Sequence, residues 1–298
     1  MKKLMAVWQL VRLEHGVMIF IAILIGSIIA QKALNIAGFP PVDKLVLTFF
    51  TALFLEASTF ALNDYYDLEI DRKNKRVDRP LVRGDLSPKT ALYLFFIFFP
   101  LGIICSYFVN YTCFIIALIT ALFAILYDVK LKKIKLLGNF YIAYVMAIPF
   151  IFGGASVLEG IGFSIRIPQV IFILALIAFL TGSGREIMKD VMDYKGDREG
   201  GVKSFPRYIG IRRSNIVAAC FYISAIFLSL LPFFMSSFEM YYYNFYYLIL
   251  VLVTDIILFV ISLQLFFKKE VNMKLHRKTT LIAIFIGLIA FLLGAFVG

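Results

Sequence analysis

Nine apolar runs of similar length constrain the fold of this chain more than any other feature. Each run is long enough for an α-helix to cross the hydrocarbon core of a bilayer, which takes about 20 residues. The runs lie at roughly residues 16–33, 44–64, 90–108, 111–127, 137–155, 168–186, 213–235, 242–267 and 279–297. Continuous runs of this kind cross lipid as helices, because a helix satisfies its own backbone hydrogen bonds. We therefore expect an all-α polytopic membrane protein in which residues 1–298 form a single integral-membrane domain.

The composition argues against most soluble functions. With 61% hydrophobic and 16% charged residues, the chain has too little polar surface for an ordinary soluble domain. The net charge of +11 would suit nucleic acid, but the basic residues lie between the apolar runs, and most Phe and Tyr residues lie inside them. No nucleic-acid partner is expected. The three cysteines, Cys105, Cys113 and Cys220, lack C-x-x-C spacing, so neither zinc nor redox chemistry is indicated.

The basic residues predict an orientation in the membrane, because Lys and Arg gather in cytoplasmic loops. A cytoplasmic N-terminus places the following segments inside: residues 1–15, 65–89, 128–136, 187–212 and 268–278. Every Lys and Arg then lies in these segments or at an inner helix end, except Lys32, Lys44 and Arg166. We expect a multi-pass protein of the cell membrane with a cytoplasmic N-terminus and a C-terminus outside.

Two acidic motifs with the same spacing follow the second and the sixth apolar run. Both read D-x-x-D-x-x-x-D, and they consist of Asp64, Asp67 and Asp71 and of Asp190, Asp193 and Asp197. On a helix these positions share an arc of roughly 60°. Carboxylates packed this closely repel one another unless a cation neutralises them, and oxygen ligands favour Mg²⁺ over zinc. The predicted orientation puts both motifs on the cytoplasmic side, so we expect them to converge on one substrate in a central cavity open to that side.

A basic cluster between Arg72 and Arg83 directly follows the first motif. Such a cluster can be a solvated cytoplasmic loop or an anchor on anionic lipid headgroups. Its position beside the carboxylates favours a further role, because cations next to bound Mg²⁺ make a site for a polyanion. Diphosphate is the obvious small polyanion, and we expect Arg72 and Arg76 to contact it.

Four isolated polar residues lie near or within the apolar runs, and three of them leave alternatives open. Arg12 either binds phosphate or follows the positive-inside bias, and His15 is either interfacial or catalytic. Glu56, inside the second run, is either a structural acid hydrogen-bonded to a neighbour or a group beneath the substrate pocket. For Asp255, in the eighth run, we expect a hydrogen bond that packs two helices.

The motif Asn63-Asp64-x-x-Asp67-x-x-x-Asp71, followed by Asp78-Arg79-Pro80 and by the second acidic motif, resembles the UbiA superfamily of intramembrane prenyltransferases. The resemblance implies a set of residues that hold Mg²⁺ and, through it, a prenyl diphosphate: Asn63, Asp64, Asp67, Asp71, Asp190, Asp193 and Asp197. Four of these are expected to be catalytic: Asp67, Asp71, Asp193 and Asp197. Asn63 is expected to contact the diphosphate as well.

The resemblance also implies Arg12 and Lys189 as diphosphate contacts. The superfamily commonly carries a Tyr and a Lys separated by three residues in the loop between the fourth and fifth helices. Here Tyr127 is separated from Lys130 by two residues and from Lys132 by four, so either lysine can serve with Tyr127.

Within the superfamily, the segments NDYYDLEIDRKNK and GREIMKDVMDYKGDREGG resemble the archaeal digeranylgeranylglyceryl phosphate synthases most. This implies Mg²⁺-dependent transfer of a geranylgeranyl group from its diphosphate to the free hydroxyl of geranylgeranylglyceryl phosphate, with the hydroxyl proton passing to an Asp or to the released diphosphate. The expected partners are the two lipid-like substrates and membrane lipids, with no obligate protein partner. Two alternatives stay open: a prenyltransferase with an aromatic quinone-precursor acceptor, and a membrane transporter with acidic ion-binding sites.

Overall fold

The computed structural model describes residues 2–73, 75–129, 135–158, 167–199, 202–268 and 271–297. In these ranges the regular structure is entirely helical, and nine helices are long and apolar enough to cross a membrane. They are α2 (Gly16–Ala33), α3 (Val42–Lys73), α5 (Pro88–Val109), α6 (Tyr111–Val129), α7 (Lys135–Ser156), α8 (Gln169–Glu199), α10 (Ile211–Phe234), α11 (Phe245–Phe267) and α12 (Met273–Val297). The expected all-α membrane fold is confirmed.

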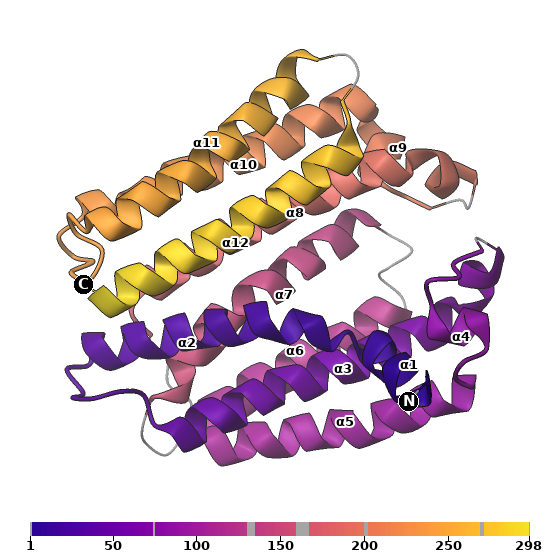
Figure 1. Cartoon of the computed structure of the whole chain (residues 1–298), viewed down its shortest axis with the longest axis horizontal. Coiled ribbons are helices and arrows are strands. Elements are labelled where there is room, and N and C mark those ends of the chain that lie inside the picture. The colour runs from indigo at the N-terminus through magenta and orange to yellow at the C-terminus, as the bar shows by residue number, and fades with distance from the viewer. Residues whose placement is uncertain are drawn as a thin grey trace.

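Short helices lie before or between the long ones. They are α1 (Lys2–Val11), the 3₁₀ turn η1 (Leu13–His15), α4 (Pro80–Arg83) and α9 (Phe205–Ile209). Three of them, α1, α4 and α9, lie at the same end of the molecule (Figure 1). These three short helices therefore form a small layer at one end of the bundle (Figure 1).

The boundary between α5 and α6 depends on Asn110. Its backbone is extended, its side-chain oxygen accepts the N–H of Cys113 at 2.8 Å, and its amide donates to the carbonyl of Ala155 at 2.8 Å. The first bond caps α6, because it satisfies one of the free N–H groups at a helix start. The second ties this cap to the end of α7. One polar residue thus turns a nearly continuous apolar stretch into two antiparallel helices.

The long helices form two groups joined through α7 (Figure 1). In one group α3 packs against α5 and α6, and in the other α10 packs against α8 and α11 while α12 packs against α11. Helix α7 packs against both α8 and α2, and α2 also contacts α12. The centre of the molecule is therefore built from α2, α7, α8 and α12.

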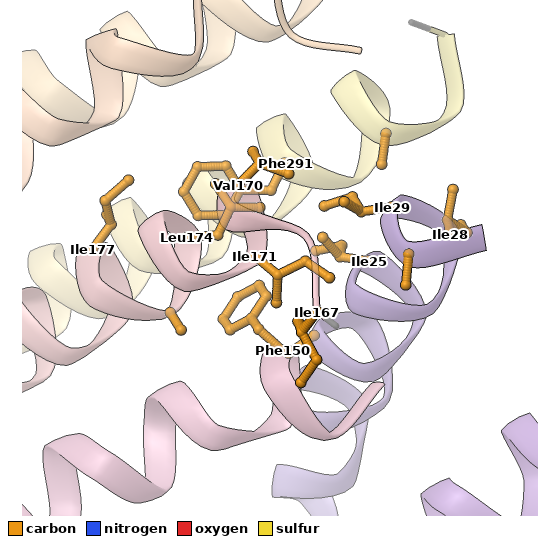
Figure 2. Close-up of a cluster of buried hydrophobic side chains, with 14 of the residues drawn as sticks. Ile25, Ile28, Ile29, Phe150, Ile167, Val170, Ile171, Leu174, Ile177 and Phe291 are labelled. Atoms are coloured by element: carbon orange, nitrogen blue, oxygen red, sulfur yellow. The ribbon is translucent and has the colours of Figure 1, made fainter. Parts of the chain in front are cut away.

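Figure 2 shows the apolar cluster at this centre, with side chains from all four helices. Ile29, Phe150, Ile171 and Phe291 are among its buried members. In lipid the hydrophobic effect does not hold helices together, so close packing and interhelical hydrogen bonds must do so.

The crossing of α2 and α7 shows how close this packing is. The hydroxyl of Ser27 donates to the carbonyl of Gly153 at 2.9 Å. A Cβ atom at Gly153 would overlap the carbonyl oxygen of Ile23, and one at Gly26 would overlap that of Phe150. The two backbones touch because neither glycine has a side chain to keep them apart.

Helices α3 and α8 extend over a greater length than the thickness of a bilayer's hydrocarbon core. They contain 32 and 31 residues, so at 1.5 Å per residue each is more than 40 Å long, against a hydrocarbon core of about 30 Å. Both acidic motifs lie on these extensions and are helical throughout. The two extended ends lie at the same end of the molecule, near α4 and α9 (Figure 1), as the predicted orientation requires.

Candidate functional site

Asp64 is the most buried acid of the first motif, with 2% of its surface exposed. One carboxylate oxygen accepts from Arg12 at 3.3 Å and from Arg79 at 2.5 Å. Its other oxygen is buried and has no hydrogen-bond partner among the described residues. Two guanidinium groups around one carboxylate leave an excess of positive charge, which suits a second anion.

The two arginines reach Asp64 from different segments. Arg12 lies in the turn between α1 and η1, with a left-handed backbone that is uncommon for a residue other than glycine. Arg79 immediately precedes α4, whose first residue is Pro80 and whose C-cap is Gly84 at φ +80°. Proline fixes the start of this short helix and glycine permits the turn at its end, so the local sequence determines where Arg79 lies.

Arg79 is a site residue that the sequence interpretation did not assign. Its Nε lies 3.9 Å from a carboxylate oxygen of Asp71 and 4.0 Å from one of Asp78, besides the contact with Asp64. The signal was present, because Arg79 is the middle residue of the Asp78-Arg79-Pro80 segment. The basic cluster alone did not distinguish it from its neighbours.

Arg76 lies in the segment between α3 and α4, shortly after the first acidic motif. Its guanidinium donates two hydrogen bonds to Asp78, at 2.9 and 2.8 Å. This bond raises the pKa of Arg76, and the charges of Asp78, Asp71 and Asp193 raise it further against the effect of partial burial. In return, the hydrogen bond from Arg76 lowers the pKa of Asp78. Asp71 belongs to α3 and Asp193 to α8, so the charges of acids from both motifs reach this one cation.

Asn63, which directly precedes the first motif, and Asp190, the first residue of the second motif, are each bonded to a side chain from a neighbouring helix. Asn63 donates to Asp128 of α6 at 2.9 Å. Asp190, also 2% exposed, accepts from Asn139 of α7 at 2.8 Å and from the backbone N–H of Phe205 in α9 at 3.3 Å. These bonds lock α3 and α8 to the helices beside them. Asp128 and Asn139 were not predicted, although a buried polar residue at the end of an apolar run is itself a signal.

Tyr127 lies near the end of α6 and contacts α7. Its ring stacks on Tyr141 with centroids 4.8 Å apart, and its phenol is within electrostatic range of acids from α3, α6 and α8. These acids are Glu186, Asp128, Asp67 and Asp190. Lys130 and Lys132 lie outside the described residues.

The other expected site residues are more open. Asp67 and Asp197 are half-buried and Asp193 is exposed. Arg72 is exposed at the end of α3, and Lys189 pairs with Glu186 of its own helix at 3.1 Å. Lys189 therefore lies on α8 directly before the second motif, whereas Arg72 lies at the exposed end of α3, which we call the rim of the site.

The model of the UbiA prenyltransferase family matches residues 19–279. This chain belongs to the UbiA prenyltransferase family. It is 41% identical over 295 residues to a digeranylgeranylglyceryl phosphate synthase from Archaeoglobus fulgidus, covering 98% of this chain and 96% of the relative. A relative of the same description from Methanococcoides burtonii is 34% identical over 293 residues, covering 96% and 98%.

Solved structures agree with this assignment. A structure of digeranylgeranylglyceryl phosphate synthase superposes on this UbiA-family chain with a TM-score of 0.78 at 34% identity, covering 99% of both chains. A UbiA homologue from Archaeoglobus fulgidus, bound to GPP and Mg²⁺, matches with a TM-score of 0.55 at 17% identity, covering 96% of this chain and 99% of that one. The resemblance inferred from the two acidic motifs is confirmed.

The donor atoms of this UbiA-family site suit Mg²⁺. Among the described residues no group of three or more His, Cys, Asp or Glu side chains is gathered tightly enough to form a metal site by protein ligands alone. Mg²⁺ rarely uses such a cage, because it keeps several waters and binds through one or two carboxylates together with substrate phosphates. The unpartnered buried oxygen of Asp64 and the open carboxylates of Asp67 and Asp193 fit that mode of binding.

Asp255 has the packing role expected for it. Its carboxylate accepts a hydrogen bond from Ser229 at 2.8 Å, which joins α11 to α10 inside the bundle. Asp255 lies near the middle of α11, one of the apolar helices of this UbiA-family fold, and not on either motif-bearing helix.

Proposed function

We propose that this chain is a digeranylgeranylglyceryl phosphate synthase. It transfers a geranylgeranyl group from geranylgeranyl diphosphate to the free hydroxyl of geranylgeranylglyceryl phosphate, a step of archaeal ether-lipid biosynthesis. The observation that carries the proposal is that the two carboxylate rows lie at the same end of the molecule (Figure 1), with Arg12 and Arg79 held against the buried Asp64 of the first row. The near full-length identity of 41% to a synthase of this kind supports the choice of substrates.

The proposed ligands of Mg²⁺ are the acids of both motifs together with the amide oxygen of Asn63: Asn63, Asp64, Asp67, Asp71, Asp190, Asp193 and Asp197. When bound, Mg²⁺ would neutralise charge on the diphosphate and so favour its departure from the allylic carbon. The UbiA homologue bound to GPP and Mg²⁺ supports this ion. The hydrogen bond from Asn63 to Asp128 fixes the Asn63 amide, so its oxygen is the atom that can face a cation.

The arginines supply the rest of the diphosphate site. Arg12 and Arg79 hold a buried carboxylate at fixed positions, and the charge of Arg76, which is bonded to Asp78, lies within electrostatic range of Asp193 in the second motif. Donors placed in advance around the developing charge stabilise the breaking of the C–O bond without rearranging. Lys189 and Tyr127 lie beside these residues on α8 and α6 and complete the proposed set with Arg72 at the rim.

Aromatic rings continue the site toward the membrane interior. Tyr127, Tyr141 and Tyr144 follow one another on α6 and α7, with centroids 4.8 and 6.4 Å apart, and Tyr144 is hydrogen-bonded to Thr120 at 2.8 Å. Such rings suit an apolar prenyl chain, and their faces attract a cationic allylic group. This row is the wall that we assign to the prenyl end of the substrate, in a central cavity open to the cytoplasm.

The phosphate of the acceptor needs a basic site of its own. An open groove of about 520 Å³ next to the second motif is lined by Tyr194, Lys195, Arg198, Glu199 and Ile211. Lys195 and Arg198 are the cations that we assign to the acceptor phosphate, because they line this groove within one helical turn of Asp197, on another face of α8 from the acidic row.

We infer that the N-terminus and the site face the cytoplasm, that the C-terminus lies outside, and that the whole chain is one domain. The N-terminus and the motif-bearing ends of α3 and α8 lie at one end of the molecule, and the C-terminus lies at the other (Figure 1). Most Lys and Arg residues belong to segments at the motif end, which supports this orientation.

The function is tested with purified protein, labelled geranylgeranyl diphosphate and two acceptors. We expect transfer to geranylgeranylglyceryl phosphate at least about a hundredfold faster than to an aromatic quinone precursor, because only the former places a phosphate in the basic groove; EDTA should abolish the transfer. Mass spectrometry of the products measures the transfer to each of the two acceptors. Preferred transfer to the aromatic acceptor would identify an aromatic prenyltransferase. Ion flux in vesicles without any transfer would identify a transporter.

A further inference from the structure

One row of contacts joins the segment between α1 and α2 to a single face of α3. Arg12 contacts Asp64 at 3.3 Å, and its guanidinium carbon lies 4.0 Å above the centroid of the Phe60 ring. The ring of His15 packs edge-on against the same Phe60, with centroids 5.4 Å apart and an angle of 77°. The Nδ1 atom of His15 lies 3.3 Å from a carboxylate oxygen of Glu56. Arg12 and His15 are therefore neighbours across one phenyl ring.

The residues of α3 in this row are spaced by four positions. Glu56, Phe60 and Asp64 are successive steps on one helical face, each about 6 Å further along the axis. Asp64 is nearest to the motif end, and Glu56 is deepest in the membrane. The order from that end inward is thus a diphosphate-binding carboxylate with its arginine, then an aromatic ring, then a histidine with its acid.

This order matches the order of the reacting groups in the proposed transfer. The diphosphate belongs beside Arg12 and Asp64, and the allylic carbon bonded to it must lie on the membrane side, because the prenyl chain is apolar. Phe60 occupies that level, and an aromatic face suits a carbon that becomes cationic. The acceptor hydroxyl must reach the same carbon, and the polar side chains next to Phe60 at that depth are His15 and Glu56.

The two side chains differ in exposure in the way that a proton-transfer pair requires. The His15 side chain is 51% exposed and can be reached by a second molecule, whereas the Glu56 side chain is only 16% exposed. When Glu56 is ionised, the Nδ1–H of His15 donates to it, and the lone pair of Nε2 then remains to accept a proton. A carboxylate that fixes the tautomer of a histidine in this way is a recurring arrangement of general bases.

We propose that His15 is the general base that takes the proton of the acceptor hydroxyl and that Glu56 is its positioning residue. This deepens the proposed function and rests on it. The C–O bond between the allylic carbon and the diphosphate breaks, and its electron pair leaves with the diphosphate. The acceptor oxygen forms a new C–O bond to that carbon, its proton moves to Nε2 of His15, and His15 later releases the proton to water. The proton thus goes to His15 rather than to an Asp of the motifs or to the diphosphate.

The test compares His15→Ala and Glu56→Gln with the wild-type protein. We expect His15→Ala to lower kcat for transfer to the hydroxyl acceptor about 10²- to 10⁴-fold, with KM for geranylgeranyl diphosphate changed less than about threefold. Added imidazole should restore part of the rate. With an acceptor that carries a thiol in place of the hydroxyl, His15→Ala should lower the transfer rate less than about tenfold. A thiol gives up its proton near neutral pH without a strong base. Glu56→Gln should lower kcat about 10- to 100-fold.

Glu239→Gln, the same change at an exposed residue between α10 and α11, is the matched control and should leave the rate unchanged. Thermal unfolding and size-exclusion profiles show whether each variant folds. A His15→Ala protein that transfers to the hydroxyl acceptor within about threefold of wild type would overturn the proposal. A folded but inactive His15→Ala protein that neither imidazole nor the thiol acceptor rescues would overturn it too. A wild-type protein that transfers nothing to geranylgeranylglyceryl phosphate would instead overturn the proposed function.

Discussion

Replacing Asp67 or Asp193 with asparagine is expected to lower geranylgeranyl transfer at least about a hundredfold, while the protein still inserts and folds. The two residues come from different helices, α3 and α8, and neither is deeply buried. Their loss removes a negative charge from the proposed Mg²⁺ site and leaves the helix packing in place. Because both helices serve one site, the two variants should show the same defect.

The measurement is the initial rate of transfer at saturating Mg²⁺, together with the thermal unfolding of each variant. Asp43→Asn is a suitable control, because Asp43 is an exposed acid at the opposite end of α3. It should retain full activity. Near-normal rates for both Asp67→Asn and Asp193→Asn would remove the metal assignment altogether. A defect in only one of them would mean that the motifs do not serve a single site.

Arg79→Ala is expected to have the second largest effect, a loss of about a hundredfold in kcat/KM for geranylgeranyl diphosphate. Arg79 is 19% exposed, donates to the buried carboxylate of Asp64 and lies 3.9 Å from Asp71. Without it, Asp64 keeps Arg12 as its arginine, and the diphosphate loses a fixed cation. Arg79→Lys should recover only part of the loss, since a lysine cannot reproduce the planar guanidinium contacts.

Steady-state kinetics and direct binding of a non-reactive prenyl diphosphate analogue measure this effect. The control is Arg212→Ala, which removes an exposed arginine at the start of α10. This substitution changes the net charge by the same amount as Arg79→Ala. A general loss of positive potential would therefore lower kcat/KM and analogue binding equally in both variants. If Arg79→Ala binds the analogue as the wild type does, then Arg79 only supports the loop before α4.

Several elements of the fold could be predicted from the sequence because the physics that determines them is local. A run of about 20 apolar residues is sufficient to indicate a membrane helix, and the nine runs match the nine long helices found in the part of the chain that the structure describes. The alternation of such helices across a membrane then places the two motifs at one end. The buried Asp255 required a partner, and Ser229 supplies it.

The partners of the site residues could not be predicted, because they depend on which helices become neighbours. Asn63 and Asp128 are 65 residues apart, and Asn139 and Asp190 are 51 apart. No periodicity links such positions. The contact between His15 and Glu56, 41 residues apart, belongs to the same class.

Arg79 was missed for a different reason. Its position follows from the turn chemistry of Pro80 and Gly84 around a helix of only four residues. Apolar periodicity carries no information about so short an element, and the surrounding arginines made the segment read as a general basic cluster. The direction of a loop side chain emerges only from the assembled structure.

The most direct test of the shared site is the location of the metal with substrate bound. Mn²⁺ suits the same carboxylate ligands as Mg²⁺ and is visible by anomalous diffraction. Crystals grown with Mn²⁺ and a non-reactive thio analogue of geranylgeranyl diphosphate should show anomalous peaks between α3 and α8, with ligands from both acidic motifs around one diphosphate. Peaks confined to one motif, or two motifs that share no diphosphate, would contradict the shared site.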